Sequence, residues 1–151
     1  MNKTYIHYGN TVFNPKLIHG PHNNNWNKPK YALWGSPEDS TCSWRGWCES
    51  NDFDSCREDN CFRFRLKNNA NVFYIDSLDK ARSLPEEPVS NPYLAKYTGI
   101  GFYDFDKLKA DGYDAVEVSL SDCWRLYDAM YGWDCDSIAI LNPNVVEVIS
   151  E

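Results

Sequence analysis

A regular alternation of apolar and cationic residues runs through CFRFRLK at 61–67, and it constrains the fold more than any other feature. In an extended chain, successive side chains point to opposite faces, so each set lies on a face of its own. The apolar set is Phe62, Phe64 and Leu66, and the cationic set is Arg63, Arg65 and Lys67. The pattern predicts a strand that buries one face of a β-sheet against a core and exposes the other.

Further short apolar segments, bounded by turn residues, predict more strands with helices between them. Strands are expected at 4–9, 31–36, 72–75, 113–120, 137–141 and 145–149. Helices are expected at 37–52 after Ser36-Pro37, at 77–84 with Ser77 as N-cap, and at 102–110 before Gly112. Residues 10–30 are rich in Asn, Pro and Gly, which predicts a long loop. Helices that fall between groups of strands indicate an α+β domain.

The length of 151 residues suits one domain, 1–151, because such a chain buries roughly two thirds of its unfolded surface around one core. The net charge of −7 disfavours proteins that grip nucleic acid electrostatically, since that grip needs clustered Lys and Arg. No apolar run approaches the roughly 20 residues that cross a bilayer, and the opening residues MNKTYIHYGN lack a signal-peptide pattern. We therefore expect a cytoplasmic protein with free thiols and no membrane partner.

The cysteines and histidines give little support for a metal site. Four cysteines cluster within 42–61, but none is spaced CxxC and no histidine lies among them. His19 and His22 lie in the Asn-rich segment without a third ligand nearby in sequence. We predict no metal and interpret the cysteines as small buried apolar residues.

Two places in the sequence hold candidate chemical groups that are ambiguous when each is taken alone. His7 lies at the end of the first predicted strand, where an isolated histidine more often has a structural role. Asp134 and Asp136 occupy alternate positions before the apolar strand SIAIL, so their side chains are expected to share a face. An acidic pair in such a place is usually solvated. The order of the segments along the chain, rather than any single residue, indicates a function.

Four segments in register resemble the ADP-ribosyltransferases of the histidine-bearing type. YIHYGN resembles the opening motif of that family, in which a strand ends in a His near a Gly. KYALWGSP resembles the second motif, a strand followed by a helix that here contains SWRGWC. LKADGYDAVEV resembles the helix and strand before the last motif, and DSIAILNPNVVEVI resembles the closing strand pair, which begins at an acidic residue. The resemblance covers most of the chain in the family's order.

The resemblance implies an ADP-ribosyltransferase-like fold, with split mixed or antiparallel sheets and flanking helices, and NAD as the substrate. It places the catalytic carboxylate on Asp136, where the family mostly has Glu, and an acceptor-orienting group on Asp134. Glu117 is a second choice for the carboxylate. The residues that it implies for NAD binding are His7, Tyr8, Gly9, Tyr31, Trp34 and Ser36.

The implied NAD contacts differ in kind. His7 binds the adenosine ribose and the nicotinamide, and Tyr8 or Gly9 supplies backbone groups for the carboxamide. Trp34 or Tyr31 supplies the aromatic face on which nicotinamide stacks. Ser36 either bonds a ribose or supports Asp136.

Three functions are compatible with this resemblance. The first is transfer of ADP-ribose to a macromolecule, a protein rather than nucleic acid, as in a small bacterial or phage-type toxin or effector. The second is NAD hydrolysis with water as the acceptor. The third is a catalytically silent module that binds a nucleotide or protein partner. The RNA 2′-phosphotransferase group shares the fold, but the charge of −7 counts against it. The cations of 63–67 are interpreted either as a pyrophosphate contact or, preferably, as a solvated sheet face.

Overall fold

The computed structural model of the chain describes residues 3–18, 27–88 and 102–149. It contains a seven-stranded mixed sheet in the order β4-β5-β6-β2-β1-β3-β7. The strands are β1 (Tyr5–Tyr8), β2 (Leu33–Pro37), β3 (Cys61–Leu66), β4 (Val72–Ile75), β5 (Ala115–Val118), β6 (Ser137–Ile140) and β7 (Val146–Val148). Neighbouring strands are antiparallel except for β4 and β5, which are parallel. The predicted α+β class and mixed pairing are confirmed.

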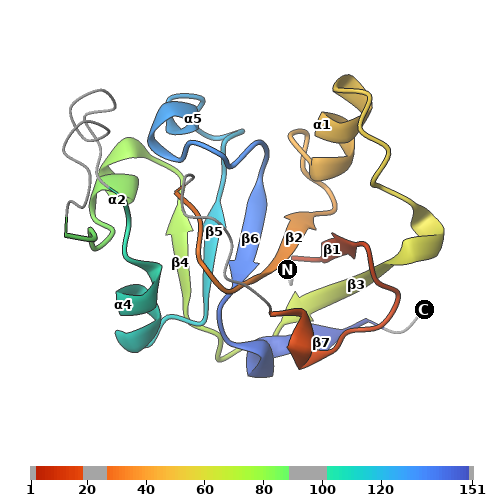
Figure 1. The fold of residues 1–151 in the computed structure, drawn as a ribbon, viewed down its shortest axis with the longest axis horizontal. Helices are drawn as coiled ribbons and strands as arrows, with labels where there is room; N and C mark the ends of the chain where they lie inside the picture. Colours follow the sequence, from red (N-terminus) through yellow and green to blue (C-terminus); the bar gives the residue numbers. More distant parts are fainter. Residues whose placement is uncertain (1–2, 19–26, 89–101, 150–151) are drawn as a thin grey trace.

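The sheet bends between β2 and β1 (Figure 1). Strands β4, β5, β6 and β2 run alongside one another, whereas β1, β3 and β7 cross them at a steep angle. Only two residue pairs join the halves in the β1–β2 register, Tyr5 with Pro37 and Ile6 with Ser36. The split that the sequence predicts therefore takes the form of a bend within one continuous sheet. Beyond these two pairs, the residues of β1 and β2 do not pair with each other.

Each face of the sheet carries an apolar core. On one face, helices α2 (Leu78–Arg82), α4 (Phe105–Ala110) and α5 (Leu126–Ala129) cover β4, β5 and β6. On the other face, Phe64 of β3 packs with Ile138 and Ile140 of β6. The alternation of 61–66 is confirmed in this core, since Phe62 and Phe64 are buried. The remaining helix, α1 (Trp44–Ser50), follows β2 and lies at the same end of the molecule as α5 (Figure 1).

The helix after β2 begins later than its sequence predicts. Ser36 and Pro37 remain extended because they pair with β1 in the sheet, and this pairing outweighs the local signal for a helix start. Helix α1 begins instead after Ser43, an N-cap whose hydroxyl accepts a hydrogen bond from the Gly46 amide at 3.2 Å. The helix before Gly112 begins at Phe105 rather than at 102, after the N-cap Asp104.

Close packing fixes the identity of Gly35 in the centre of β2. A Cβ atom at this position would lie 2.8 Å from Cζ and 2.9 Å from Cε1 of Phe64. These distances are shorter than carbon atoms tolerate, so the ring of Phe64 occupies the volume that a side chain would need. A glycine is required where β2 and β3 meet across the core.

Two sequence predictions concern features outside the sheet. None of the helices in the described part of the chain has both the length and the apolar character needed to cross a bilayer. None of the six cysteines forms a disulfide, and only Cys48 and Cys135 are buried, so the interpretation of the cysteines as buried apolar residues is wrong for the other four. His19 and His22 lie outside the described residues.

Candidate functional site

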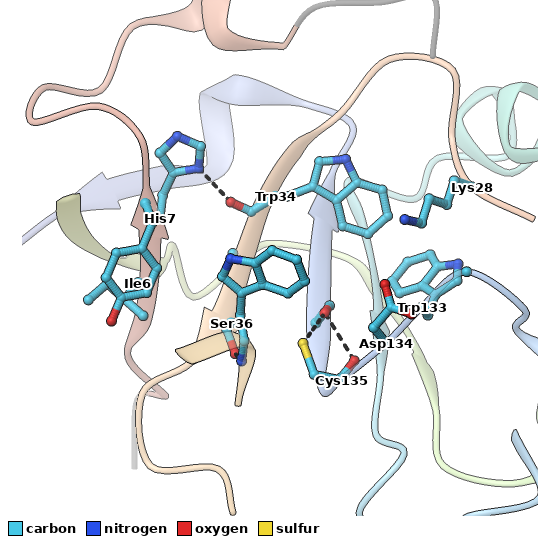
Figure 2. Close-up of a pocket in the computed structure, with 13 residues that line it drawn as sticks. Ile6, His7, Lys28, Trp34, Ser36, Trp133, Asp134 and Cys135 are labelled. Atoms are coloured by element: carbon cyan, nitrogen blue, oxygen red, sulfur yellow. Dashed lines mark hydrogen bonds between the residues drawn. The ribbon is translucent and has the colours of Figure 1, made fainter. Parts of the chain in front are cut away.

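A cavity of about 490 Å³ opens beside the bend of the sheet, where β1 and β2 diverge (Figure 2). Most of its walls come from three segments, the end of β1, the middle of β2, and the turn that leads into β6, and Lys28 and Trp44 complete them. Residues that define it are His7, Tyr8, Trp34, Ser36, Trp133 and Asp134. The fold thus brings together residues that the sequence places at the beginning, the first third and the end of the chain.

His7 connects the two strands beside the cavity. Its Nδ1 atom lies 2.7 Å from the carbonyl oxygen of Trp34, and its Nε2 atom lies 3.2 Å from Nδ2 of Asn10. A carbonyl can only accept a hydrogen bond, so Nδ1 donates and Nε2 accepts. The imidazole ring also packs on Phe62, with ring centroids 5.0 Å apart. These contacts fix the orientation of the ring at the edge of the cavity.

Two indole rings form an aromatic corner in the cavity. Trp34 and Trp133 meet edge to face, with ring centroids 4.7 Å apart and an angle of 67° between the planes. Trp133 is buried, and its Nε1 donates a hydrogen bond to the carbonyl of Asn27 at 2.6 Å. Trp133 was not predicted as a site residue, although its position immediately before Asp134 is a usable signal. A rigid corner of this kind suits a flat heteroaromatic ligand.

Lys28 is the cation of the cavity. Its ammonium lies 5.4 Å from the centroid of the Trp34 ring, and burial lowers its pKa although the charge of Asp134 raises it. No described residue accepts a hydrogen bond from this ammonium or forms an ion pair with it. Nothing in the Asn-rich segment around Lys28 predicted this role. An anionic group in the cavity would supply the acceptor that Lys28 lacks.

The two aspartates before β6 face different surroundings, so the prediction that they share a face is wrong. Strand β6 begins at Ser137, and the alternation of side chains does not extend back through the turn of 131–136. Asp134 lines the cavity and is its only carboxylate among the described residues, whereas Asp136 does not line it. The resemblance implies that His7 and Asp136 both act on NAD, but the structure places Asp134, and not Asp136, in the cavity that His7 lines.

Asp136 has a different set of contacts, all of them internal. Its Oδ2 atom accepts hydrogen bonds from the hydroxyls of Ser40 at 2.6 Å and Ser121 at 2.5 Å, and its Oδ1 accepts one from the Ser121 amide at 2.9 Å. The residue is 4% exposed. The Asp136 carboxylate joins the loops that follow β2 and β5 at the start of β6.

The other residues implied for NAD binding are distributed inside and outside the cavity. Tyr8, Trp34 and Ser36 line it, but Tyr31 does not and is 49% exposed, so of the two aromatic candidates only Trp34 lies at the cavity. Gly9 is also absent from the walls, and its amide already donates to the carbonyl of Asn60 at 2.8 Å.

Ser36 supports the turn before β6. Its hydroxyl donates to the carbonyl oxygen of Asp136 at 3.1 Å and accepts from the amide of Trp44 at 3.0 Å. Of the two roles that the sequence suggests for Ser36, support of Asp136 is the one with a contact in the structure. The same hydroxyl holds the start of α1, which places Trp44 in the cavity wall.

Glu117, the second choice for the carboxylate, does not line the cavity. It is buried and bound by the ammonium of Lys3 at 2.6 Å and the hydroxyl of Tyr5 at 2.9 Å. On β3, Arg63 pairs with Glu38 and Glu58, and Arg65 pairs with Glu147. Because these guanidinium groups already bind carboxylates, the interpretation of 63–67 as a solvated face fits better than that of a pyrophosphate contact.

Comparison of the chain with models of protein families, with curated proteins and with solved structures finds no significant match in any of the three.

Proposed function

We propose that the chain binds NAD in this cavity and breaks the bond between nicotinamide and its ribose, so that ADP-ribose passes to a macromolecular acceptor. The observation that carries the proposal is one cavity lined by His7, Trp34 and a single carboxylate, Asp134. These residues come from three of the segments that resemble the ADP-ribosyltransferases. Residues so far apart in sequence meet in one place because β1, β2 and β6 are neighbours in the sheet.

The polar and aromatic groups of the cavity match the parts of a nicotinamide nucleotide. The corner formed by Trp34 and Trp133 offers a face on which the nicotinamide ring stacks. The ammonium of Lys28 lies over the same Trp34 ring and offers a positive charge to the neighbouring phosphate. An aromatic face and a cation on one side of a cavity favour a ligand whose ring and anionic group are separated by about the length of a sugar.

Asp134 supplies the chemical step. When the glycosidic bond breaks, positive charge develops on the ribose carbon, and a nearby carboxylate stabilises this oxocarbenium-like state. Asp134 accepts no hydrogen bond from another described side chain, so both of its oxygens are available to the ribose. The loss of a single electrostatic group of this kind lowers rates by roughly a hundredfold to a thousandfold.

Incubation of the protein with NAD labelled in its adenylate half, with and without a cell lysate, tests the proposal. The wild-type protein is expected to release nicotinamide and to label a lysate component. Asp134→Asn should lose about a hundredfold in rate. Asp79→Asn, on the 98% exposed side chain of α2, is the matched control and should keep full activity.

Comparison of the incubations with and without lysate distinguishes transfer of ADP-ribose to a macromolecule from hydrolysis of NAD. Nicotinamide release that is equally fast without lysate identifies an NAD glycohydrolase that uses water. Retention of full activity by Asp134→Asn would contradict the proposed role of this carboxylate.

A second candidate is a catalytically silent module that binds the nucleotide without turnover. The burial of Asp136 favours it, because the carboxylate that the resemblance marks as catalytic is sequestered by Ser40 and Ser121. NAD that binds in calorimetry but releases no nicotinamide would identify this case.

A further inference from the structure

Large aromatic side chains are exposed on two segments that flank the cavity, 44–59 around α1 and 121–136 around α5. Trp124, Tyr127 and Tyr131 are 76%, 49% and 53% exposed, and Phe53 is 53% exposed. Trp44 of the first segment and residues 132–135 of the second contribute cavity walls, and helices α1 and α5 lie at the same end of the molecule (Figure 1). We call the two segments together the aromatic rim. Apolar surface gathered in this way is typical of an interaction site.

Helix α5 holds part of this surface in a fixed position. Its inner side is buried in the core through Leu126, Ala129 and Met130. Of the exposed aromatic residues, Tyr127 belongs to this short helix, and Trp124 and Tyr131 lie in the turns just before and just after it. Tyr131 is followed directly by Gly132, which lines the cavity. The exposed surface around α5 therefore leads to the cavity.

The aromatic rim is strongly acidic. Segment 44–59 holds five carboxylates and two arginines, and segment 121–136 holds four carboxylates and one arginine. Asp136 is buried, and three others pair with arginines of their own segment. The remaining carboxylates form no ion pair with any described residue: Asp52, Asp54, Asp122, Asp128 and Asp134. With nine carboxylates and three arginines, the two segments carry −6 of the net charge of −7.

We propose that the aromatic rim binds a basic polypeptide segment rich in Arg and Lys, and that this segment belongs to the acceptor of ADP-ribose. The part that concerns the acceptor rests on the proposed function. Exposed aromatic rings bind cations through their faces, and the guanidinium of Arg125 already lies 5.7 Å from the centroid of the Trp124 ring. The carboxylates that surround the rings attract the same cations and steer their approach.

The negative charge of the aromatic rim favours a basic polypeptide over the other partners that exposed aromatic rings can bind. Nucleic acid also stacks on aromatic rings, but its phosphates are repelled by the acidic rim. An anionic lipid surface meets the same repulsion. A second copy of the chain would bring two acidic rims together. A basic polypeptide is the partner whose charge complements both kinds of side chain.

Fluorescence anisotropy with a labelled Arg- and Lys-rich peptide tests the inference without NAD. The wild-type protein is expected to bind this peptide, with an affinity that falls as salt rises, and to leave unbound a peptide with Glu in place of each cation. The double variant Trp124→Ala/Tyr127→Ala should bind about tenfold more weakly. Tyr31→Ala is the matched control, since Tyr31 is equally exposed but lies outside the rim, and it should bind as the wild type does.

The charge is tested separately by Asp122→Asn/Asp128→Asn, which removes no packing and should reduce both the affinity and its salt dependence. Asp79→Asn is the control for this pair and should change neither. The inference is overturned if the basic peptide does not bind or if both double variants bind it as the wild type does. Equal binding of the acidic peptide or of a single-stranded oligonucleotide would also overturn it, as would self-association of the chain through the rim.

The same peptide offered as acceptor with labelled NAD separates this inference from the proposed function. Peptide binding without any consumption of NAD leaves the aromatic rim in place and refutes the proposed activity. Consumption of NAD with no binding of the peptide refutes the inference that the aromatic rim binds a basic peptide but leaves the proposed activity standing.

Discussion

The replacement Asp136→Ala should unfold the chain far more readily than Asp134→Ala. In Asp136→Ala, the Ser40 hydroxyl, the Ser121 hydroxyl and the Ser121 amide lose their common acceptor, the buried Asp136 carboxylate. Each hydrogen bond to a charged group contributes about 1.5–3 kcal/mol, and water recovers part of the loss because Ser121 is exposed and Ser40 is half-buried. We therefore expect the free energy of unfolding to fall by about 3–5 kcal/mol, a large part of the 5–15 kcal/mol typical of a domain.

Asp134→Ala removes a side chain that lines a cavity and accepts no hydrogen bond from a described residue. Its free energy of unfolding should change by no more than about 0.5 kcal/mol. Urea unfolding followed by tryptophan fluorescence measures both values under the same conditions. Equal losses in the two variants, or a larger loss in Asp134→Ala, would refute the assignment of Asp136 to structure and Asp134 to the site.

Three further outcomes follow from the site. Lys28→Met should weaken NAD binding about tenfold or more but leave nicotinamide riboside, which has no phosphate, unaffected in calorimetry. Burial lowers the pKa of Lys28, so its charged ammonium destabilises the folded state at every pH below the folded-state pKa. At pH 7 the free energy of unfolding of Lys28→Met should therefore equal or exceed that of the wild type. Gly35→Ala should lose about 1–3 kcal/mol in urea unfolding, since its Cβ would lie 2.8 Å from the Phe64 ring. Burial raises the pKa of Cys135 to about 12. Iodoacetamide at pH 8 should therefore label Cys135 about a hundredfold more slowly in the native protein than in urea, as measured by mass spectrometry. Equal labelling rates would contradict the burial of this thiol.

Local patterns in the sequence were sufficient to predict most of the elements. The alternation of 61–66, the apolar run SIAIL and the N-cap Ser77 each depend on neighbours within a few residues, and each prediction is confirmed. The position of each strand in the sheet depends on distant contacts. Strand β4 follows β3 after a polar turn, yet it pairs with β5 at the opposite edge of the sheet. No local signal distinguishes this arrangement from a hairpin.

The site was predictable in part for the same reason. His7 and Trp34 lie on strands, where alternation fixes the direction of a side chain, and both face the cavity. Asp134 and Asp136 lie in a turn before the strand, where alternation does not apply, so the sequence could not indicate that Asp134 lines the cavity and that Asp136 is buried. Lys28 belongs to a segment without periodicity, so only the folded chain reveals its place over Trp34.

A crystal structure of the protein soaked with NAD tests the central claim most directly. We predict that the nicotinamide ring lies in the corner of Trp34 and Trp133, with a carboxylate oxygen of Asp134 at hydrogen-bond distance, about 3 Å, from the nicotinamide ribose. Density for NAD elsewhere on the molecule, or a bound NAD whose ribose is out of reach of Asp134, would contradict the account.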